Sequence, residues 1–179
     1  MASIKVRTSH RRPKTGGSMD FDLQEFVVYP RYGVGRVLGV AKKEFAGQAE
    51  RCLGIRFEEQ NLALYIPVHR LEHVRLRKIM SRTMTTEVMS AMKSRARFNT
   101  SNSHKERVKL YQEKFNTGDP VEMAEVARDL ARLSKRQDLS MEEEGLCRDS
   151  INLLAREIAI SRKGDLQRIR RDIETVLYR

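Results

Sequence analysis

The hydrophobic pattern of this chain changes its period once, near residue 78, and that change limits the folds that it can adopt. Residues 20–77 contain short runs of β-branched and aromatic side chains separated by turn residues, which is typical of strands. From residue 78 onward, apolar residues recur three and four positions apart, which is typical of amphipathic helices. The sequence therefore predicts an α+β protein in which a small antiparallel β-barrel or strongly bent sheet precedes a compact helical bundle.

Four strands are expected in the first part of the chain, at residues 26–29, 34–45, 52–57 and 62–67. A turn is expected at residues 46–48, and a polar connection at residues 58–61. The glycines at positions 33, 35, 39 and 54 favour bends and bulges, because a side chain there would obstruct close approach of two backbones. Strands at this spacing with short turns predict an SH3/Tudor-like antiparallel barrel.

Helix starts in the second part are indicated by capping residues that precede apolar stripes. They are Ser103, Asp119, Ser140 and Asp165, and Ser103 and Ser140 each have a glutamate three residues on, as in a capping box. A further helix is expected at about residues 83–95, and Gly118 is expected to end the helix that begins near Ser103. The expected organisation is a flexible basic arm at 1–19, a β-barrel domain at 20–77 and a helical domain at 78–179.

The net charge of +11 is concentrated at the two ends of the chain. Residues 1–19 carry five basic side chains and no acids, whereas residues 20–77 carry nine basic and eight acidic side chains. Residues 78–179 carry 21 basic and 16 acidic side chains. A cationic surface attracts phosphate groups, so the charge favours a nucleic-acid partner, although excess lysine and arginine also serves solubility alone.

Several classes of protein are disfavoured by the sequence. The uncharged apolar runs are too short for a membrane-spanning helix or a secretory signal, so we expect a cytoplasmic protein without a membrane partner. Cys52 and Cys147 lie far apart in apolar patterns, which argues against a disulfide scaffold. His69 and His73 are four residues apart but lack a third metal ligand. No residue is indicated as a nucleophile with its base, so we expect no enzyme, no cofactor and no small-molecule substrate.

Six cations flank the polar loop at residues 99–103. They are Lys93, Arg95 and Arg97 before the loop and Lys105, Arg107 and Lys109 after it, with Glu106 as the one acid between the first and the last of them. Because a helix N-terminus also presents backbone N–H groups to a phosphate, this cluster is the candidate nucleic-acid contact. A solvated helix face explains the same cations as well.

Five segments occur in the order known from one bacterial family. They are FVVYPRYGVGRV at 26–37, IRFEEQNLALYIPV at 55–68, FNTGD at 115–119, EVARDL at 125–130, and LSMEE with LLAREIA between residues 139 and 159. Together they span essentially residues 20–160, and the chain resembles the CarD/CdnL-type bacterial transcription regulators. The N-terminal module of that family is shared with the polymerase-interacting domain of transcription-repair coupling factors.

The resemblance implies that the N-terminal barrel binds the β subunit of RNA polymerase by adding a strand to an edge of its partner. The matching edge residues in this chain are Lys43, Leu62, Leu64, Tyr65 and Pro67. The helical module would then contact promoter DNA at the upstream edge of the transcription bubble and stabilise the open complex without a catalytic step. Such a protein would act in the bacterial cytoplasm, at the nucleoid.

The resemblance also implies a wedge in the minor groove, because the family carries a tryptophan near the start of the helix that precedes its Gly-Asp turn. The matching position is His104, and this chain has no tryptophan. The other expected DNA contacts are Arg95, Arg97, Lys105, Arg107 and Lys109, while Glu106 stands where the family has a cation. The alternative is an RNA-binding or nucleoid protein with an SH3-like barrel that acts without polymerase.

Overall fold

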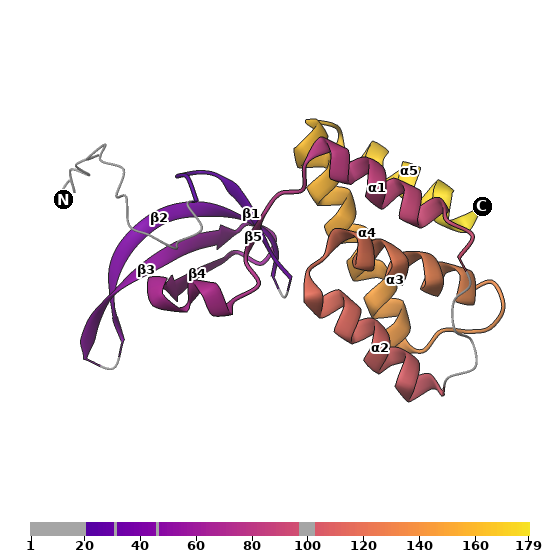
Figure 1. Ribbon diagram of the computed structural model, residues 1–179, viewed down its shortest axis with the longest axis horizontal. Coiled ribbons are helices and arrows are strands. Elements are labelled where there is room, and N and C mark those ends of the chain that lie inside the picture. Colours follow the sequence, from indigo (N-terminus) through magenta and orange to yellow (C-terminus); the bar gives the residue numbers. More distant parts are fainter. Residues whose placement is uncertain (1–20, 31, 46, 97–102) are drawn as a thin grey trace.

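The computed structural model describes residues 21–30, 32–45, 47–96 and 103–179. It places a bent β-sheet beside a bundle of helices, so that the β part and the helical part form two adjoining bodies (Figure 1). The expected basic arm at residues 1–19 lies outside the described residues. The fold class is the one predicted, an antiparallel sheet at the N-terminal side followed by helices.

Five antiparallel strands form one sheet among the described residues, in the order β4-β3-β2-β1-β5. The strands are β1 (Phe26–Tyr29), β2 (Gly33–Phe45), β3 (Gln48–Phe57), β4 (Leu62–Pro67) and β5 (Arg77–Lys78). A short 3-10 helix, η1 (Val68–His73), follows β4. The two edges of the sheet are therefore β4 and β5, and the longest strands, β2 and β3, lie between them.

The strands differ from the predicted ones at two places. Strand β3 begins at Gln48 rather than at residue 52, because β2 and β3 continue outward as a polar ribbon in which Lys42 pairs with Arg51 and Glu44 with Ala49. Backbone pairing needs no apolar pattern, so the alternation of side chains gave no sign of this extension. Strand β5 and η1 were not predicted, since each is too short to show a hydrophobic period.

The interior of the bent sheet is filled by apolar residues from every part of the β module. They are Val27, Val37, Leu53, Ile55, Phe57, Ile66, Leu71 and Leu76. Gly35 permits this packing, because a Cβ at that position would lie 2.6 Å from Ile55 Cγ2 and 2.8 Å from Phe57 Cε1. Leu71 comes from η1, so this short helix helps to close the interior of the sheet.

Five α-helices follow the sheet within the described residues, and the last four begin where their capping residues predict; Ser81, which caps the first, was not predicted. The helices are α1 (Arg82–Lys93), α2 (His104–Thr117), α3 (Pro120–Leu133), α4 (Met141–Arg162) and α5 (Leu166–Tyr178). Both predicted capping boxes, at Ser103 and Ser140, have their reciprocal hydrogen bonds. Gly118 ends α2 in the left-handed conformation, with φ of 76°.

The buried face of α2 differs from its apolar pattern. Four residues at helical spacing, His104, Val108, Tyr111 and Phe115, suggest an inward stripe, but Tyr111 is the one member of it that is buried. Arg107 is buried instead, because α2 packs beside α4 and the guanidinium finds a carboxylate there. An apolar pattern does not reveal a buried cation, since the pattern counts arginine as a surface residue.

A buried ion pair joins the sheet to the bundle. Glu157 of α4 is fully buried and accepts hydrogen bonds from Arg77 Nη1 and, at 2.9 Å, from Arg77 Nη2. The same carboxylate accepts the backbone N–H of Met80 at 2.7 Å, and Arg77 Nε donates to the carbonyl of Gly118 at 2.7 Å. The Glu157 carboxylate of α4 therefore binds both β5 and the segment that connects β5 to α1. Arg77 also binds the turn between α2 and α3.

Apolar contacts and a close backbone approach reinforce this junction. Val28 and Val34 of the sheet belong to the same buried cluster as the helical core. Gly118 lies directly against Pro30, so close that a Cβ on Gly118 would be only 2.6 Å from Pro30 Cγ. The positive φ and this contact together explain why the turn between α2 and α3 carries glycine. The sheet and the bundle are thus packed against each other rather than merely connected.

We predict that Glu157→Ala lowers the free energy of unfolding by about 3–5 kcal/mol, since it leaves the partly buried Arg77 and the Met80 N–H without their acceptor. Denaturant unfolding measures this change. The control is Glu59→Ala, which removes the exposed partner of Arg156 and should cost less than about 1 kcal/mol. Equal losses in the two variants would contradict a central role for Glu157.

Candidate functional site

The outer edge of β4 is unpaired among the described residues. Strand β4 pairs with β3 on one side through the full register from Leu62 to Pro67 and has no partner strand on the other. An edge strand presents a row of backbone N–H and C=O groups to solvent, which is the template for adding a strand from another chain. The sequence-predicted edge at residues 62–67 therefore lies where a partner strand can pair with it.

Lys43 and Tyr65 are brought together on one face of the sheet. Lys43 lies in the β2–β3 ribbon, where it pairs with Glu50, and its Nζ is 4.2 Å from the centroid of the Tyr65 ring. This is the geometry of a cation–π interaction. Gly54, opposite Tyr65 on β3, leaves room for the ring, because a Cβ there would be 3.0 Å from Tyr65 Cε1. Lys43 is thus a neighbour of the β4 edge although it belongs to another strand.

The remaining predicted edge residues differ in what they expose. Leu64 packs against the core of the sheet, so a partner strand would meet its backbone rather than its whole side chain. Leu62 and Pro67 are half-buried at the two ends of β4.

Leu38 was missed by sequence reasoning. It sits at the bulge between Val37 and Gly39 and is 38% exposed, and its Cβ lies beside Gly54.

The start of α2 presents part of the predicted basic cluster to solvent. His104, Lys105 and Lys109 are exposed and line a shallow groove of about 320 Å³, whose other lining residues are Val108, Gln112, Glu113 and Glu142. Arg97 lies outside the described residues. Lys105 and Lys109 are four residues apart on one helix, so they share a face and can reach neighbouring phosphates.

Arg107 is not part of this exposed face, which corrects its expected role as a direct DNA contact. It is 7% exposed, and its Nε donates to Glu143 Oε1 at 2.9 Å, while Glu143 is 1% exposed. Burial raises the pKa of Glu143, but the backbone N–H of Ser140 and the Arg107 guanidinium outweigh it and lower the pKa below its ordinary value of 4.5. Arg107 therefore fastens α2 to the start of α4.

His104, at the expected wedge position, faces the acidic first turn of α4. Its Nε2 is 3.7 Å from Glu142 Oε2, and its Nδ1 is 3.7 Å from Glu143 Oε2. The imidazole is 45% exposed, so one side of the ring contacts the protein and the other is open. The ring is therefore available at the surface but lies beside two carboxylates.

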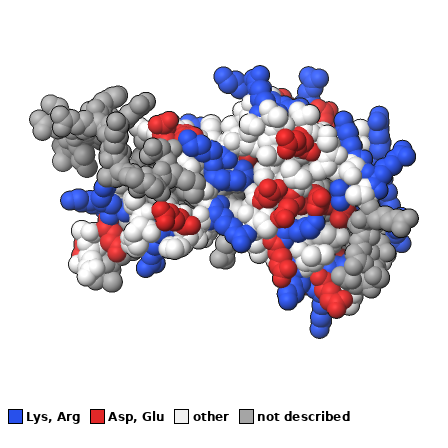
Figure 2. All heavy atoms as spheres, viewed as in Figure 1, with Lys and Arg blue, Asp and Glu red and all other residues white. Residues whose placement is uncertain are grey.

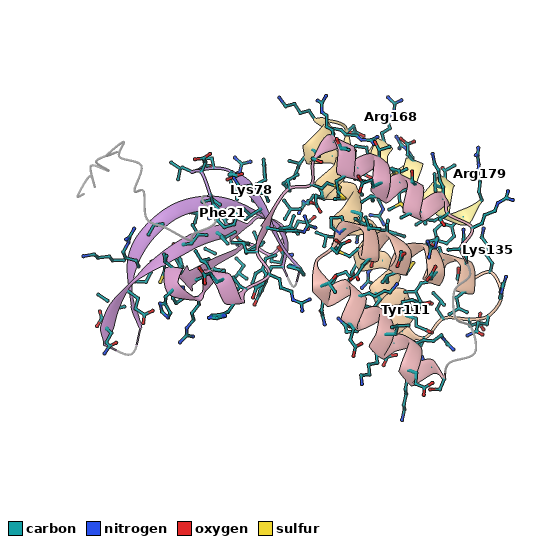
Figure 3. All side chains as sticks on the ribbon, in the orientation of Figure 1. Phe21, Lys78, Tyr111, Lys135, Arg168 and Arg179 are labelled. Atoms are coloured by element: carbon teal, nitrogen blue, oxygen red, sulfur yellow. The ribbon has the colours of Figure 1, made fainter. Side chains whose placement is uncertain are left out.

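The bundle carries further cations at the end farthest from the sheet, where α1, α3 and α5 finish (Figure 1). We call this surface the distal basic end, and it comprises Lys93, Arg95, Lys135, Arg136 and Arg179. Lysine and arginine side chains gather along it in Figure 2, and Figure 3 shows Lys135 and Arg179 together there. The segments meet because Arg132 donates to the carbonyls of Ser94 and Ala96, and Lys135 Nζ donates to the carbonyl of Arg179 at 2.8 Å.

Sequence reasoning missed Lys135, Arg136 and Arg179, because they approach Lys93 and Arg95 only after α1, α3 and α5 pack side by side. The local signal was the polar SKRQ segment directly after α3. Helix C-termini favour cations on electrostatic grounds, which accounts for Lys93 in the last turn of α1. Lys135 and Arg136 lie beyond the end of α3, so the helix dipole explains them less well.

Family comparisons cover both halves of the chain. Residues 21–80 match the family described as the CarD-like/TRCF RID domain, and residues 87–174 match the CarD C-terminal domain. The chain belongs to the CarD family of bacterial transcription regulators. The two matches follow the structural division, since the first covers β1 to β5 and the second covers most of α1 to α5. Its assignment to transcription regulation rests on this membership.

A curated relative is described as a transcription factor, and one solved structure is also similar in sequence. The protein named "Putative transcription factor YdeB" from Bacillus subtilis (strain 168) is 26% identical over 145 residues, which cover 78% of this chain and 91% of that protein. The solution NMR structure of the 72-residue N-terminal domain of Myxococcus xanthus CarD is 30% identical in sequence. That match covers 39% of this chain and 93% of the NMR chain, with a TM-score of 0.28.

Two features are absent from the part of the chain that the structure describes. None of the helices there combines the length and the apolar character needed to cross a membrane. The same part of the chain holds no group of three or more His, Cys, Asp or Glu side chains that could bind a metal ion. His69 and His73 both lie exposed on η1.

We predict that Glu143→Gln flattens the acid dependence of stability. A carboxylate whose pKa is lowered in the folded state stabilises the protein above its unfolded pKa, about 4.5, and loses this contribution as the pH falls through the folded pKa. Thermal unfolding between pH 6 and about pH 3 should therefore show a smaller drop in Tm for Glu143→Gln than for the wild type. Glu144→Gln, an exposed neighbour, is the control, and a slope unchanged by Glu143→Gln would contradict the role of the Arg107 pair.

Proposed function

We propose that this CarD-family protein binds the β subunit of RNA polymerase through the open β4 edge and contacts promoter DNA with the start of α2 and the distal basic end. In this proposal the protein stabilises the open promoter complex and performs no chemical step. The observation that carries it is that the open β4 edge lies on the sheet and the exposed cations lie on the bundle, two bodies joined by the buried Glu157 carboxylate (Figure 1).

The polymerase contact is supported by the free backbone edge and by the side chains beside it. A strand of the β subunit would pair with β4, and main-chain hydrogen bonds would supply affinity. Tyr65 and Lys43 would supply specificity, because an aromatic ring held under an ammonium group offers both an apolar face and a positive charge. Leu38 would add apolar area next to Tyr65.

The DNA contact is supported by charge and by the exposure of the cations. Lys105 and Lys109 line one face of α2, and Arg95 lies at the distal basic end with Lys135. Contacts of this kind bind phosphate oxygens and position a protein on the duplex without reading its sequence. His104 would meet DNA from the same face of α2, with its open side toward the groove.

The junction between the sheet and the bundle would fix the position of the DNA-binding surface relative to the polymerase-binding edge. A bundle packed on the sheet through Val28, Val34 and Glu157 cannot swing freely, so docking of β4 on polymerase would determine where the distal basic end lies. Pre-organisation of this kind reduces the entropy lost on DNA binding. A nucleic-acid-binding protein that acts without polymerase, which is the alternative function, would gain nothing from such a fixed distance between its two ends.

We predict that Tyr65→Ala weakens binding to the isolated β subunit by about tenfold, because it removes the ring that holds Lys43 and the apolar area beside the edge. Lys43→Ala should weaken binding in the same direction. Lys42→Ala is the matched control, since Lys42 is the adjacent exposed lysine of β2. The affinity for the β subunit is measured by calorimetry or surface plasmon resonance. If Tyr65→Ala and Lys43→Ala bind as tightly as Lys42→Ala, this edge is not the polymerase contact.

We predict that the double variant Lys105→Ala, Lys109→Ala lowers the affinity for duplex DNA and reduces the slope of log K against log salt concentration by about two. Arg107 is left in place, because its removal would damage the junction of α2 with α4. The control is Lys42→Ala, Arg51→Ala, which removes two exposed cations from the β2–β3 ribbon. A slope equal to that of the wild type would exclude this face of α2 from the DNA interface.

A further inference from the structure

We propose that the cavity between the sheet and the bundle binds a phosphate group. The cavity has a volume of about 260 Å³ and is open to solvent on one side. Arg36 and Arg56 line it from β2 and β3, and Arg156 lines it from α4. Glu58 is the one acid in the described lining, and Glu59 pairs with Arg156 beside it, so three guanidinium groups and two carboxylates leave a net charge of +1 around the cavity. None of its three arginines belongs to the residues assigned to the polymerase contact or to the DNA contact.

Two of these arginines face each other directly. Arg36 and Arg56 are register partners in the β2–β3 ladder, and like charges opposite each other destabilise a sheet. Lys42 and Arg51 form a second such pair, but they lie on the exposed ribbon, where water and salt screen the repulsion. At the cavity the third guanidinium, Arg156, approaches from the helical side together with its carboxylate partner Glu59.

The hydrogen-bond partners of Arg36 and Arg56 do not neutralise the charge of these two arginines. Arg56 Nη2 donates to the Asn61 amide oxygen at 3.4 Å, and Arg36 Nη1 donates to the Gln24 amide oxygen at 3.5 Å. Both acceptors are neutral and both distances are long. Arg156 alone has a carboxylate, from Glu59 at 2.6 Å.

The Nε of Arg36 is shielded from solvent and has no hydrogen-bond acceptor among the described residues. A buried donor without an acceptor is costly, and more so on a charged group. The guanidinium is also held in place, since its Cζ lies 4.7 Å from the centroid of the Phe26 ring. Arg36 is therefore held in place, and its Nη1, which makes only the long bond to Gln24, is the donor that a ligand could reach.

Phosphate is the chemistry that fits these features. Guanidinium groups bind phosphate oxygens through paired, charge-assisted hydrogen bonds. The cavity is smaller than the roughly 300–1,000 Å³ typical of sites for drug-sized ligands, so it suits a small anionic group rather than a large molecule. The phosphate would come either from a small phosphorylated metabolite or from a DNA backbone that passes the junction. Figure 2 shows basic side chains over this junction, between the sheet and the bundle.

The test uses the full chain with inorganic pyrophosphate as the probe, at constant ionic strength. Binding is measured by calorimetry, together with the rise in Tm that a ligand of the folded state produces. We expect Arg56→Gln to weaken pyrophosphate binding at least tenfold, while Arg51→Gln leaves it unchanged. Arg56 is exposed, so its replacement preserves the fold, and relief of the repulsion with Arg36 should raise the Tm of Arg56→Gln in ligand-free buffer.

Duplex DNA binding distinguishes the two sources of phosphate. If the source is a small metabolite, pyrophosphate binds without displacing DNA, and Arg56→Gln binds DNA as Arg51→Gln does. If the source is the DNA backbone, Arg56→Gln binds DNA more weakly than Arg51→Gln does. The proposal is overturned if Arg56→Gln and Arg51→Gln match each other for both pyrophosphate and DNA. Binding to the β subunit should be unchanged in both variants, so failure of this site leaves the proposed polymerase contact standing.

Discussion

The structure depends on one carboxylate, that of Glu157, which is removed from water between the sheet and the bundle. Its charge is tolerable there because the Arg77 guanidinium and the Met80 N–H surround it with donors. Arg77 extends the network to the carbonyl of Gly118, so the turn between α2 and α3 is fixed to the sheet as well. Val28 and Val34 bury apolar surface against the helices. The hydrogen bonds fix the orientation of the sheet relative to the bundle, because hydrogen bonds are directional. A protein that has to hold two binding surfaces at a fixed distance needs such a directional joint.

Cations of the bundle fall into two groups. Some arginines are bound within the protein and stabilise its fold, whereas exposed lysines remain available to a partner. Arg107 holds the start of α4 through Glu143, and Arg132 holds the chain after α1 through two carbonyls. Lys105 and Lys109 have no such task within the described residues and remain at the surface. The total charge of +11 therefore overstates the surface available to nucleic acid. Burial and pairing of each cation, rather than the number of cations, decide which of them can meet a phosphate.

Much of the fold could be predicted from the sequence because its signals are local. A capping serine with a glutamate three residues on, as at Ser103 and Ser140, specifies a helix start through contacts within one turn. The position of Arg107 could not be predicted, since its partner Glu143 belongs to another helix. The distal basic end was beyond reach for the same reason: it exists only once three helices end side by side. Sequence reasoning located β4 correctly, yet the meeting of Lys43 with Tyr65 depends on the twist of three strands and on the glycine between them.

The environment of His104 suggests that, on the proposed function, this chain would bind DNA differently from family members that carry a tryptophan at this position. A tryptophan wedge acts through a large apolar face, whereas His104 offers a smaller ring with Glu142 and Glu143 within 3.7 Å. Those carboxylates repel phosphate, so insertion at this point would be weaker than in relatives that carry tryptophan. The distal basic end and the Lys105–Lys109 face are exposed and could compensate by binding the DNA backbone. On the proposed function, this chain would depend more on phosphate contacts and less on the wedge, and its DNA binding would be correspondingly more sensitive to salt.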